Sequence, residues 1–191
     1  MHAARFLGQF LRQPGRTGAV LPSSPSLAHM MTDAARLGDA EVIVEWGTGN
    51  GVITERILAK KRPAAGFLAV ELNEEFVTAT QRRCPTAKIV HDSAAHTRKH
   101  LSAHGWRGCD RLVCGLPWAS FPEKLQDDLL DTMYDVLNPG GIFVTFAYLQ
   151  GLLLPAGQRF RKKLQARFPQ VTRTRTVWLN FPPAFVYCVR K

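Results

Sequence analysis

From residue 40 onward, short apolar runs alternate with segments of helical periodicity, and this alternation constrains the fold more than any other feature of the chain. Repeated strand–helix units of this length predict an α/β fold with a doubly wound, mainly parallel sheet and right-handed crossovers. The expected strands cover 41–46, 66–72, 87–90, 110–114 and 142–148, and the expected helices cover 51–61, 74–83, 94–104 and 122–137. A basic helix over 158–168 and two strand-like runs, 171–179 and 184–189, predict an antiparallel hairpin at the sheet edge.

The segment VIVEWGTGNG, residues 42–51, predicts a cofactor loop between the first strand and the first helix. Gly47, Gly49 and Gly51 allow positive φ and a close approach of the backbone to a ligand. The third glycine comes one residue earlier than in the dinucleotide fingerprint, G-x-G-x-x-G. Glu45 at the strand end would repel phosphates, but it suits the cationic amino group and sulfonium of S-adenosylmethionine (SAM).

Two further acids follow the next two expected strands. Glu71 can accept hydrogen bonds from both ribose hydroxyls, and Asp92 can accept one from the adenine amino group. Ser93 and Ala94 offer backbone N–H groups beside it. Each acid alone could be a helix cap, but a glycine loop followed by three acids at strand ends favours a SAM site.

The charge of the chain is strongly segregated. The net charge is +10, yet residues 1–30 hold three arginines and no acid, and residues 136–191 hold nine basic residues and no acid. Such segregation predicts a surface for an anionic partner, either nucleic acid or an acidic membrane. The alternative is a solvated basic face that serves solubility.

Other features of the composition indicate a cytoplasmic protein. The four cysteines form neither a CxxC pair nor a zinc-site spacing, so we expect reduced, mostly buried thiols. No apolar run approaches the length of about 20 residues that a spanning helix needs. The first residues lack the apolar region and cleavage site of a signal peptide.

With these motifs, the chain resembles the Rossmann-like class I methyltransferases. More closely, it resembles the bacterial phospholipid N-methyltransferases, which convert phosphatidylethanolamine stepwise to phosphatidylcholine. The shared segments, which extend over nearly the whole chain, are GAVLPSS (18–24), VEWGTGNG (44–51), AVELN (69–73), HDSA (91–94), CGLPW (114–118), NPGG (138–141), FAY (146–148) and NFPPAFVY (180–187).

The resemblance implies SAM as cofactor and S-adenosylhomocysteine as product. The implied cofactor-binding residues are Glu45, Gly47, Thr48, Gly49, Gly51, Glu71, Leu72, Asp92, Ser93, Ala94 and Gly115. In the family resembled, an N-terminal amphipathic helix docks on anionic lipid and the following loop closes over the active site. We therefore expect peripheral association with the inner face of the cell membrane, and no metal and no obligate protein partner.

The first thirty residues carry the expected membrane segment, and residues 31–191 the expected methyltransferase domain. Phe6, Leu7, Phe10 and Leu11 share one face of a helix over 2–13, a pattern typical of helices that lie in a bilayer interface. The same pattern would suit a helix packed on the core. In the loop over 15–24, the expected substrate-binding residues are Arg16, Gly18, Ser23 and Ser24.

The predicted chemistry of amine methylation involves four more residues. Tyr148 could accept or orient the amine, and Asn180 could hydrogen-bond the early amine intermediates. Trp118 and Tyr187 could form walls that hold the methylated cation, although core packing is the ordinary role of a single aromatic residue.

Three histidines, His96, His100 and His104, share one helix face. Two such histidines can bind zinc, but no carboxylate or cysteine completes the site, so we expect a solvated face.

Two other functions fit parts of the sequence. An RNA adenine N6-dimethyltransferase would share the fold and would explain the basic charge. Those enzymes carry N-L-P-[YF] on the fourth strand, where this chain has Cys114-Gly115-Leu116-Pro117, and no basic stripe with aromatic residues for base stacking is evident. Nucleic acid is therefore the less favoured partner. A non-catalytic SAM- or membrane-binding module is the second alternative.

Overall fold

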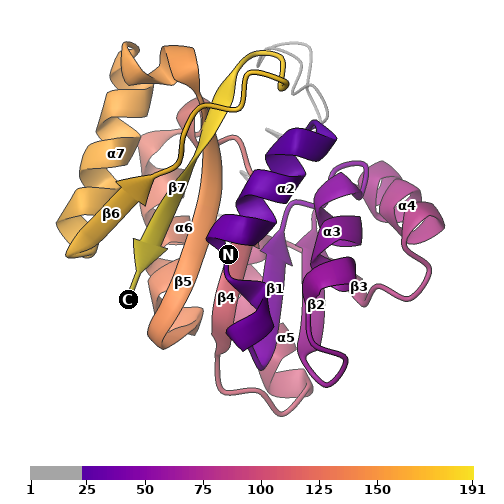
Figure 1. Ribbon diagram of the computed structural model, residues 1–191. Helices are drawn as coiled ribbons and strands as arrows, with labels where there is room; N and C mark the ends of the chain where they lie inside the picture. Colours follow the sequence, from indigo (N-terminus) through magenta and orange to yellow (C-terminus); the bar gives the residue numbers. More distant parts are fainter. Residues whose placement is uncertain (1–22) are drawn as a thin grey trace.

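The computed structural model describes residues 23–191, and a seven-stranded sheet forms its centre (Figure 1). The strands follow the order β3-β2-β1-β4-β5-β7-β6, in which β7 alone runs antiparallel to its two neighbours. Their bounds are β1 Val42–Trp46, β2 Gly66–Glu71, β3 Ile89–His91, β4 Cys109–Cys114, β5 Leu137–Tyr148, β6 Gln170–Arg173 and β7 Ala184–Arg190. The predicted doubly wound sheet with an antiparallel C-terminal pair is confirmed.

Helices cover both faces of this sheet. Figure 1 shows α2 and α3 in front of the strands and α5 and α6 behind them. The α-helices are α2 Pro25–Ala34, α3 Val52–Lys60, α4 Glu74–Arg83, α5 Thr97–Ala103, α6 Glu123–Val136 and α7 Pro155–Arg167. Short 3₁₀ turns are η2 Leu37–Asp39, η3 Ala94–His96, η4 Trp118–Ser120 and η5 Leu149–Leu152.

Each face has its own apolar core. Residues of α2 and α3, such as Leu27, Met31 and Ile57, pack on one side of the central strands. Residues of α5, α6 and α7, such as Leu101 and Leu129, pack on the other side. The strands β1 and β4 are covered by both layers, which explains why four successive residues of each, 43–46 and 111–114, are buried instead of alternating with exposed ones.

Helix α2 was absent from the sequence-based expectation. The Ser24 side chain accepts a hydrogen bond from Leu27 N at 3.1 Å, and Pro25 occupies the first turn, so this helix has a regular cap. It packs against α3 and β7. The helix is continuous across residues 30 and 31, where we placed the domain boundary. Since residues 1–22 lie outside the described part, that division stays a prediction.

The structure also changes three predicted bounds. The helix expected over 94–104 is split into η3 and α5, and β5 begins at Leu137, before the Asn-Pro-Gly-Gly segment. The strand expected over 171–179 ends at Arg173. There the Thr174 side chain accepts a hydrogen bond from Val186 N at 3.1 Å, and the irregular chain beyond it meets β7 once more, at an isolated bridge between Val177 and Ala184.

Within residues 23–191, every helix is too short or too polar to cross a lipid bilayer.

Candidate active site

The candidate site lies at the edge of the sheet where the parallel strands end. The order of the strands changes direction between the neighbours β1 and β4. From β1 the chain proceeds outward through β2 to β3, and it then returns to β4 on the other side of β1. Ligands of open α/β sheets bind at such a switch point, outside the carboxyl ends of the strands. The predicted acids and the glycine loop all meet at this edge.

Three glycines shape the loop between β1 and α3. Gly47, Gly49 and Gly51 have φ values of 75°, 53° and 81°, which L-residues other than glycine seldom adopt. A Cβ atom on Gly47 would lie 2.8 Å from the Leu116 side chain, whereas one on Gly49 would have no atom within 4 Å. The loop is therefore packed tightly against the β4 connection at one end, and it faces open space at its middle glycine.

The Glu71 carboxylate ties this loop to the end of β2. Its Oε2 accepts hydrogen bonds from Thr48 N at 2.8 Å and Gly49 N at 3.3 Å, while Oε1 accepts one from Asn73 N at 2.8 Å. Burial raises the pKa of Glu71, and these backbone hydrogen bonds oppose the rise. Glu71 lies where the ribose contact was expected. Oε1, which accepts one hydrogen bond, retains a lone pair for a ligand hydroxyl, whereas both lone pairs of Oε2 are engaged by the loop.

Glu45 is fully buried between β1 and α3. Its Oε2 accepts a hydrogen bond from the Thr54 hydroxyl at 2.7 Å, while Oε1 has no partner among the described residues. Burial raises the pKa of Glu45 to about 8, and the charge of Glu71 adds to the rise. An unpaired acceptor beside the glycine loop is compatible with a cationic ligand group. The role of Glu45 toward the SAM amino group stays a prediction.

Asp92 is held by two histidines. Its Oδ1 lies 2.8 Å from His96 Nδ1, and its Oδ2 lies 2.7 Å from His100 Nε2. Although burial acts in the opposite direction, these hydrogen bonds and one from Ser93 N lower the pKa of Asp92 to about 2. The expectation of a solvated histidine face is wrong for His100, which is mostly buried. His104 instead stacks on Trp106, with ring centroids 4.9 Å apart.

The remaining predicted cofactor residues line the same edge. Ser93 is buried and its hydroxyl accepts a hydrogen bond from Ala95 N at 3.2 Å, with Ala94 buried beside it. The carbonyl oxygen of Leu72 lies 3.0 Å from His91 Nε2. Thr48 is buried, and its hydroxyl accepts a hydrogen bond from Thr80 at 3.0 Å.

Gly115 joins the cofactor loop to the next part of the site. Its N–H donates to Trp46 O at 2.7 Å, and a Cβ atom at this position would lie 2.5 Å from Gly47 O. A side chain would therefore force the ends of β1 and β4 apart.

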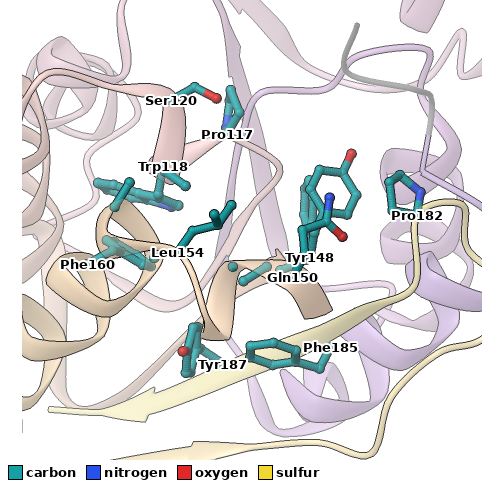
Figure 2. Close-up of a pocket in the computed structure, with 16 residues that line it drawn as sticks. Pro117, Trp118, Ser120, Tyr148, Gln150, Leu154, Phe160, Pro182, Phe185 and Tyr187 are labelled. Atoms are coloured by element: carbon teal, nitrogen blue, oxygen red, sulfur yellow. The ribbon is translucent and has the colours of Figure 1, made fainter. Parts of the chain in front are cut away.

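Beyond Gly115, an aromatic cavity of about 390 Å³ opens at the ends of β4 and β5 (Figure 2). Its walls contain neither acidic nor basic residues. In Figure 2, Trp118 and Phe160 lie on one side of Leu154, Tyr148 lies on the other, and Phe185 and Tyr187 lie below. The aromatic residues of the wall are Trp118, Phe146, Tyr148, Phe160, Phe185 and Tyr187.

Packing fixes the rings of this cavity in place. The Trp118 indole donates to the Thr145 hydroxyl at 3.0 Å and stacks on Phe160, with centroids 4.9 Å apart. The Tyr187 ring meets Phe185 edge to face at 4.9 Å. Trp118 and Tyr187 are thus packed in the core and also line the cavity, and their role toward a methylated cation stays a prediction.

The Tyr148 hydroxyl, like that of Tyr187, has no hydrogen-bond partner among the described residues. Its ring meets Phe146 edge to face at 5.5 Å, and Figure 2 shows it beside Pro182. Burial raises the pKa of Tyr148, so the hydroxyl stays protonated at neutral pH. The oxygen is available to donate to, or accept from, a ligand.

Asn180 links two segments that are far apart in the sequence. Its Oδ1 accepts a hydrogen bond from Ser24 N at 3.0 Å, and its Nδ2 donates to Pro182 O at 2.7 Å. Both ends of the amide are therefore engaged, and the catalytic role expected for Asn180 stays a prediction. The Ser24 hydroxyl caps α2, and Ser23 precedes it, partly exposed.

Arg16 and Gly18 lie outside the described residues, as does the expected amphipathic helix. Across residues 23–191, no cluster of three or more histidine, cysteine or acidic side chains could hold a metal ion.

Sequence reasoning missed three of the cavity's aromatic wall residues, Phe146, Phe160 and Phe185. Phe160 is one apolar residue in a basic helix, and Phe185 belongs to the NFPPAFVY segment that carried the resemblance. The presence of that segment could have drawn attention to Phe185. Nothing in the local sequence around Phe160 distinguishes a cavity wall from a core residue.

Comparisons with known proteins place this geometry among methyltransferases. No family profile matches the chain. The ornithine lipid N-methyltransferase of Singulisphaera acidiphila is 29% identical over 188 residues, which cover 97% of this chain and 94% of that protein.

Solved structures of low sequence identity share the fold. The O-methyltransferase of Bacillus cereus in complex with S-adenosylhomocysteine has a TM-score of 0.70 and 12% identity, over 98% of this chain and 91% of that chain. An O-methyltransferase from Streptomyces achromogenes, involved in tomaymycin synthesis and solved with SAM, has a TM-score of 0.67 and 17% identity, over 100% and 90%. The architecture of this chain is the Rossmann-like fold of class I methyltransferases.

Proposed function

We propose that the chain is a SAM-dependent N-methyltransferase that acts on the amino head group of a membrane lipid. The observation that carries the proposal is the uncharged aromatic cavity beside the glycine loop. The similarity to a lipid N-methyltransferase over nearly the full length of both proteins supports the same substrate class.

The cavity suits the successive states of an amine that is being methylated. An amine must lose its proton to act as a nucleophile, although an alkylammonium group titrates near ~10.4 in water. A wall without carboxylates favours the neutral amine, because desolvation lowers the pKa of an ammonium group. Each added methyl group makes the product more apolar, and aromatic faces attract an alkylated cation.

The cofactor would supply a methyl group on a cationic sulfonium. Glu71 would hold the ribose hydroxyls and Asp92 the adenine amino group, while Glu45 would face the amino group of the methionine portion. The Tyr148 hydroxyl, which has no partner in the described residues, would orient the incoming amine. Gly115 keeps the cofactor loop and the aromatic cavity adjacent, because any side chain there would meet Gly47 O.

Two lipid head groups present the required primary amine. The resemblance of the motifs favours phosphatidylethanolamine, whose stepwise methylation leads towards phosphatidylcholine at the inner face of the cell membrane. The similarity to an ornithine lipid N-methyltransferase favours the side-chain amine of an ornithine lipid. Both lipids place an amine at the end of a short polar head group above acyl chains. The cavity would therefore accommodate the amine of either lipid in the same way.

A methyl-transfer assay tests the proposal. The purified chain is incubated with methyl-labelled SAM and with vesicles that contain phosphatidylethanolamine, vesicles that contain ornithine lipid, or ribosomal RNA. We expect label in at least one of the two lipids and none in the RNA. The Glu71→Ala variant serves as the cofactor-site control and should transfer little label.

Label in RNA alone would contradict the lipid proposal and favour an RNA methyltransferase. Binding of SAM without transfer to any of the three acceptors would favour the non-catalytic module. The assay therefore distinguishes a lipid substrate from an RNA substrate, and it also shows which of the two lipids accepts the methyl group.

A further inference from the structure

Four large apolar side chains are strongly exposed near the cavity mouth. Trp178, Leu179 and Phe181 are 70%, 81% and 80% exposed, and Leu153 is 83% exposed. Exposed apolar residues are ordinary when they are scattered. These four belong to only two segments, the loop over 177–183 and the turn over 149–154, and exposed apolar side chains gathered in this way mark an interaction surface.

Both segments border the cavity. Leu149 N donates to Pro183 O at 2.8 Å, which ties the turn to the loop. Pro182 and Leu154 line the cavity itself (Figure 2). Phe181 and Leu153 each precede one of these wall residues in the chain. Phe181 and Leu153 therefore adjoin the cavity wall, and Trp178 and Leu179 line the neighbouring groove on the same loop.

Unpaired cations lie beside the same loop. A groove between α2, α3 and the loop contains Arg56 and Arg175 as well as Trp178 and Leu179. Both arginines are exposed, and neither guanidinium has a hydrogen bond or ion pair with another described residue. His29 also lines this groove, but it lies 3.1 Å from Asp33. The groove thus combines apolar side chains with two free guanidinium groups.

We propose that the loop over 177–183 inserts into the surface of an anionic membrane, with Arg56 and Arg175 bound to lipid phosphates. Burial of Trp178, Leu179 and Phe181 in the bilayer interface supplies the apolar contribution. The two arginines supply an electrostatic contribution that falls with salt. This surface rests on the proposed lipid substrate, since it brings the cavity mouth to the head groups. It is distinct from the N-terminal segment expected to bind lipid.

Membrane chemistry fits this patch better than the other possible occupants. A second copy of the chain that met this loop with its own residues 136–191 would offer the arginines no acid. Residues 136–191 contain no acidic residue. An anionic lipid surface satisfies the arginines and the apolar side chains at the same time. If the substrate is a lipid, the bilayer that contains this lipid must come close to the mouth of the cavity.

Tryptophan fluorescence reports the insertion directly. The chain has four tryptophans. Trp46 and Trp118 are buried, Trp106 is partly buried, and Trp178 alone is strongly exposed. We expect vesicles of phosphatidylcholine and phosphatidylglycerol to shift the emission to shorter wavelength, and brominated phosphatidylcholine to quench it. The Trp178→Phe variant should bind the vesicles but lose both signals.

Replacing two exposed apolar residues by glutamate measures the contribution of the loop to vesicle binding. Trp178→Glu/Leu179→Glu in the full chain should lower vesicle affinity roughly tenfold or more, because two apolar groups no longer enter the interface. Ala64→Glu/Ala103→Glu is the matched control, since it adds the same charge at exposed positions on the opposite edge of the sheet. That control should bind nearly as the unmodified chain does.

Neutralising the arginines tests the second contribution. Arg56→Gln and Arg175→Gln should each weaken binding to anionic vesicles about fivefold, with no change on pure phosphatidylcholine. Arg107→Gln, an exposed arginine elsewhere, is the matched control.

These vesicles contain neither an amino lipid nor SAM, so the result does not depend on methyl transfer. Unquenched Trp178 fluorescence with bound vesicles would overturn the proposal. So would equal binding by the Glu double variant and its control, or a concentration-dependent dimer that protects Trp178 without lipid. If deletion of residues 2–13 increased quenching of Trp178 by aqueous iodide, the chain itself would be the occupant, and the proposal would fail.

Discussion

At the ends of β1 and β2, short polar contacts hold the candidate cofactor region, and Glu71 alone accepts hydrogen bonds from three backbone N–H groups. At the ends of β4 and β5, six aromatic rings from several segments form the cavity wall, and no charged side chain joins them. We call these regions the polar half and the aromatic half. Hydrogen bonds fix the side chains of the polar half, and packing of the rings fixes those of the aromatic half.

This contrast has a chemical consequence. Directional hydrogen bonds can recognise a ligand with a fixed set of polar groups, as a nucleoside has. Ring faces recognise shape and positive charge without fixed direction, so one cavity can hold an amine with different numbers of methyl groups. The variants below should separate the two halves, beginning with the largest expected effect.

Glu45→Gln should stabilise the protein at high pH. The folded-state pKa of Glu45 is raised to about 8 from 4.5, so the buried side chain costs increasing stability as pH rises between these values. At pH 9 the gain should be on the order of a few kcal/mol, and it should vanish below pH ~4.5. Thermal unfolding at several pH values measures the difference. A gain that does not depend on pH would show that Glu45 is charged throughout.

Glu71→Ala should damage the polar half alone. Three backbone N–H groups lose their acceptor, and SAM affinity should fall by about 1–3 kcal/mol. Titration calorimetry with SAM measures the cofactor affinity, and titration calorimetry with a short-chain amino lipid measures binding in the cavity. A parallel loss of lipid binding would show that the halves are coupled.

Asp92→Ala should have a smaller effect, because His96 and His100 already hold both carboxylate oxygens. We expect SAM affinity to fall by about 1 kcal/mol. The lowered pKa of Asp92 stabilises the fold above pH ~4, and this contribution is lost as pH falls toward about 2. The difference in melting temperature between variant and parent should therefore shrink in acid. Unchanged SAM affinity would remove the adenine contact from the site.

Tyr148→Phe should have the smallest effect and should act on the aromatic half alone. The ring and its contact with Phe146 are retained, so only the unpaired hydroxyl is lost. Turnover with the lipid should fall about two- to fivefold, the lower part of the range for one neutral hydrogen bond, while SAM affinity stays the same. Full turnover in this variant would exclude a role for the oxygen.

The polar half could be predicted from the sequence because its residues stand at strand ends and helix starts. The glycine loop and the Asn73 cap of α4 are each defined within one strand–helix unit. Glu71 lies at the strand end where it was expected, although its partners Thr48 and Gly49 belong to the preceding unit. The histidine partners of Asp92 also lie within one turn or two of it, but the helical pattern alone did not show that their rings turn inward.

The aromatic half could be predicted only in part. Trp118 and Tyr148 follow strands at the correct edge, but the place of Phe160 depends on how α7 packs against η4. The bond between Asn180 and Ser24 N joins residues 156 positions apart, which no local pattern specifies. Helix α2 was missed since its cap lies within a segment interpreted as an active-site loop.

The position of β7 has a consequence for the order in which the protein can assemble during synthesis. β6 leaves the ribosome before β7, yet β7 lies between β6 and β5 and is the strand to which β6 pairs. Residues 170–173 therefore have no strand to join until residues 184–190 have been made. Phe185 and Tyr187 belong to that late strand. A nascent chain can form the polar half while it is still tethered to the ribosome, but it acquires the pocket for its acceptor only after the last strand has emerged.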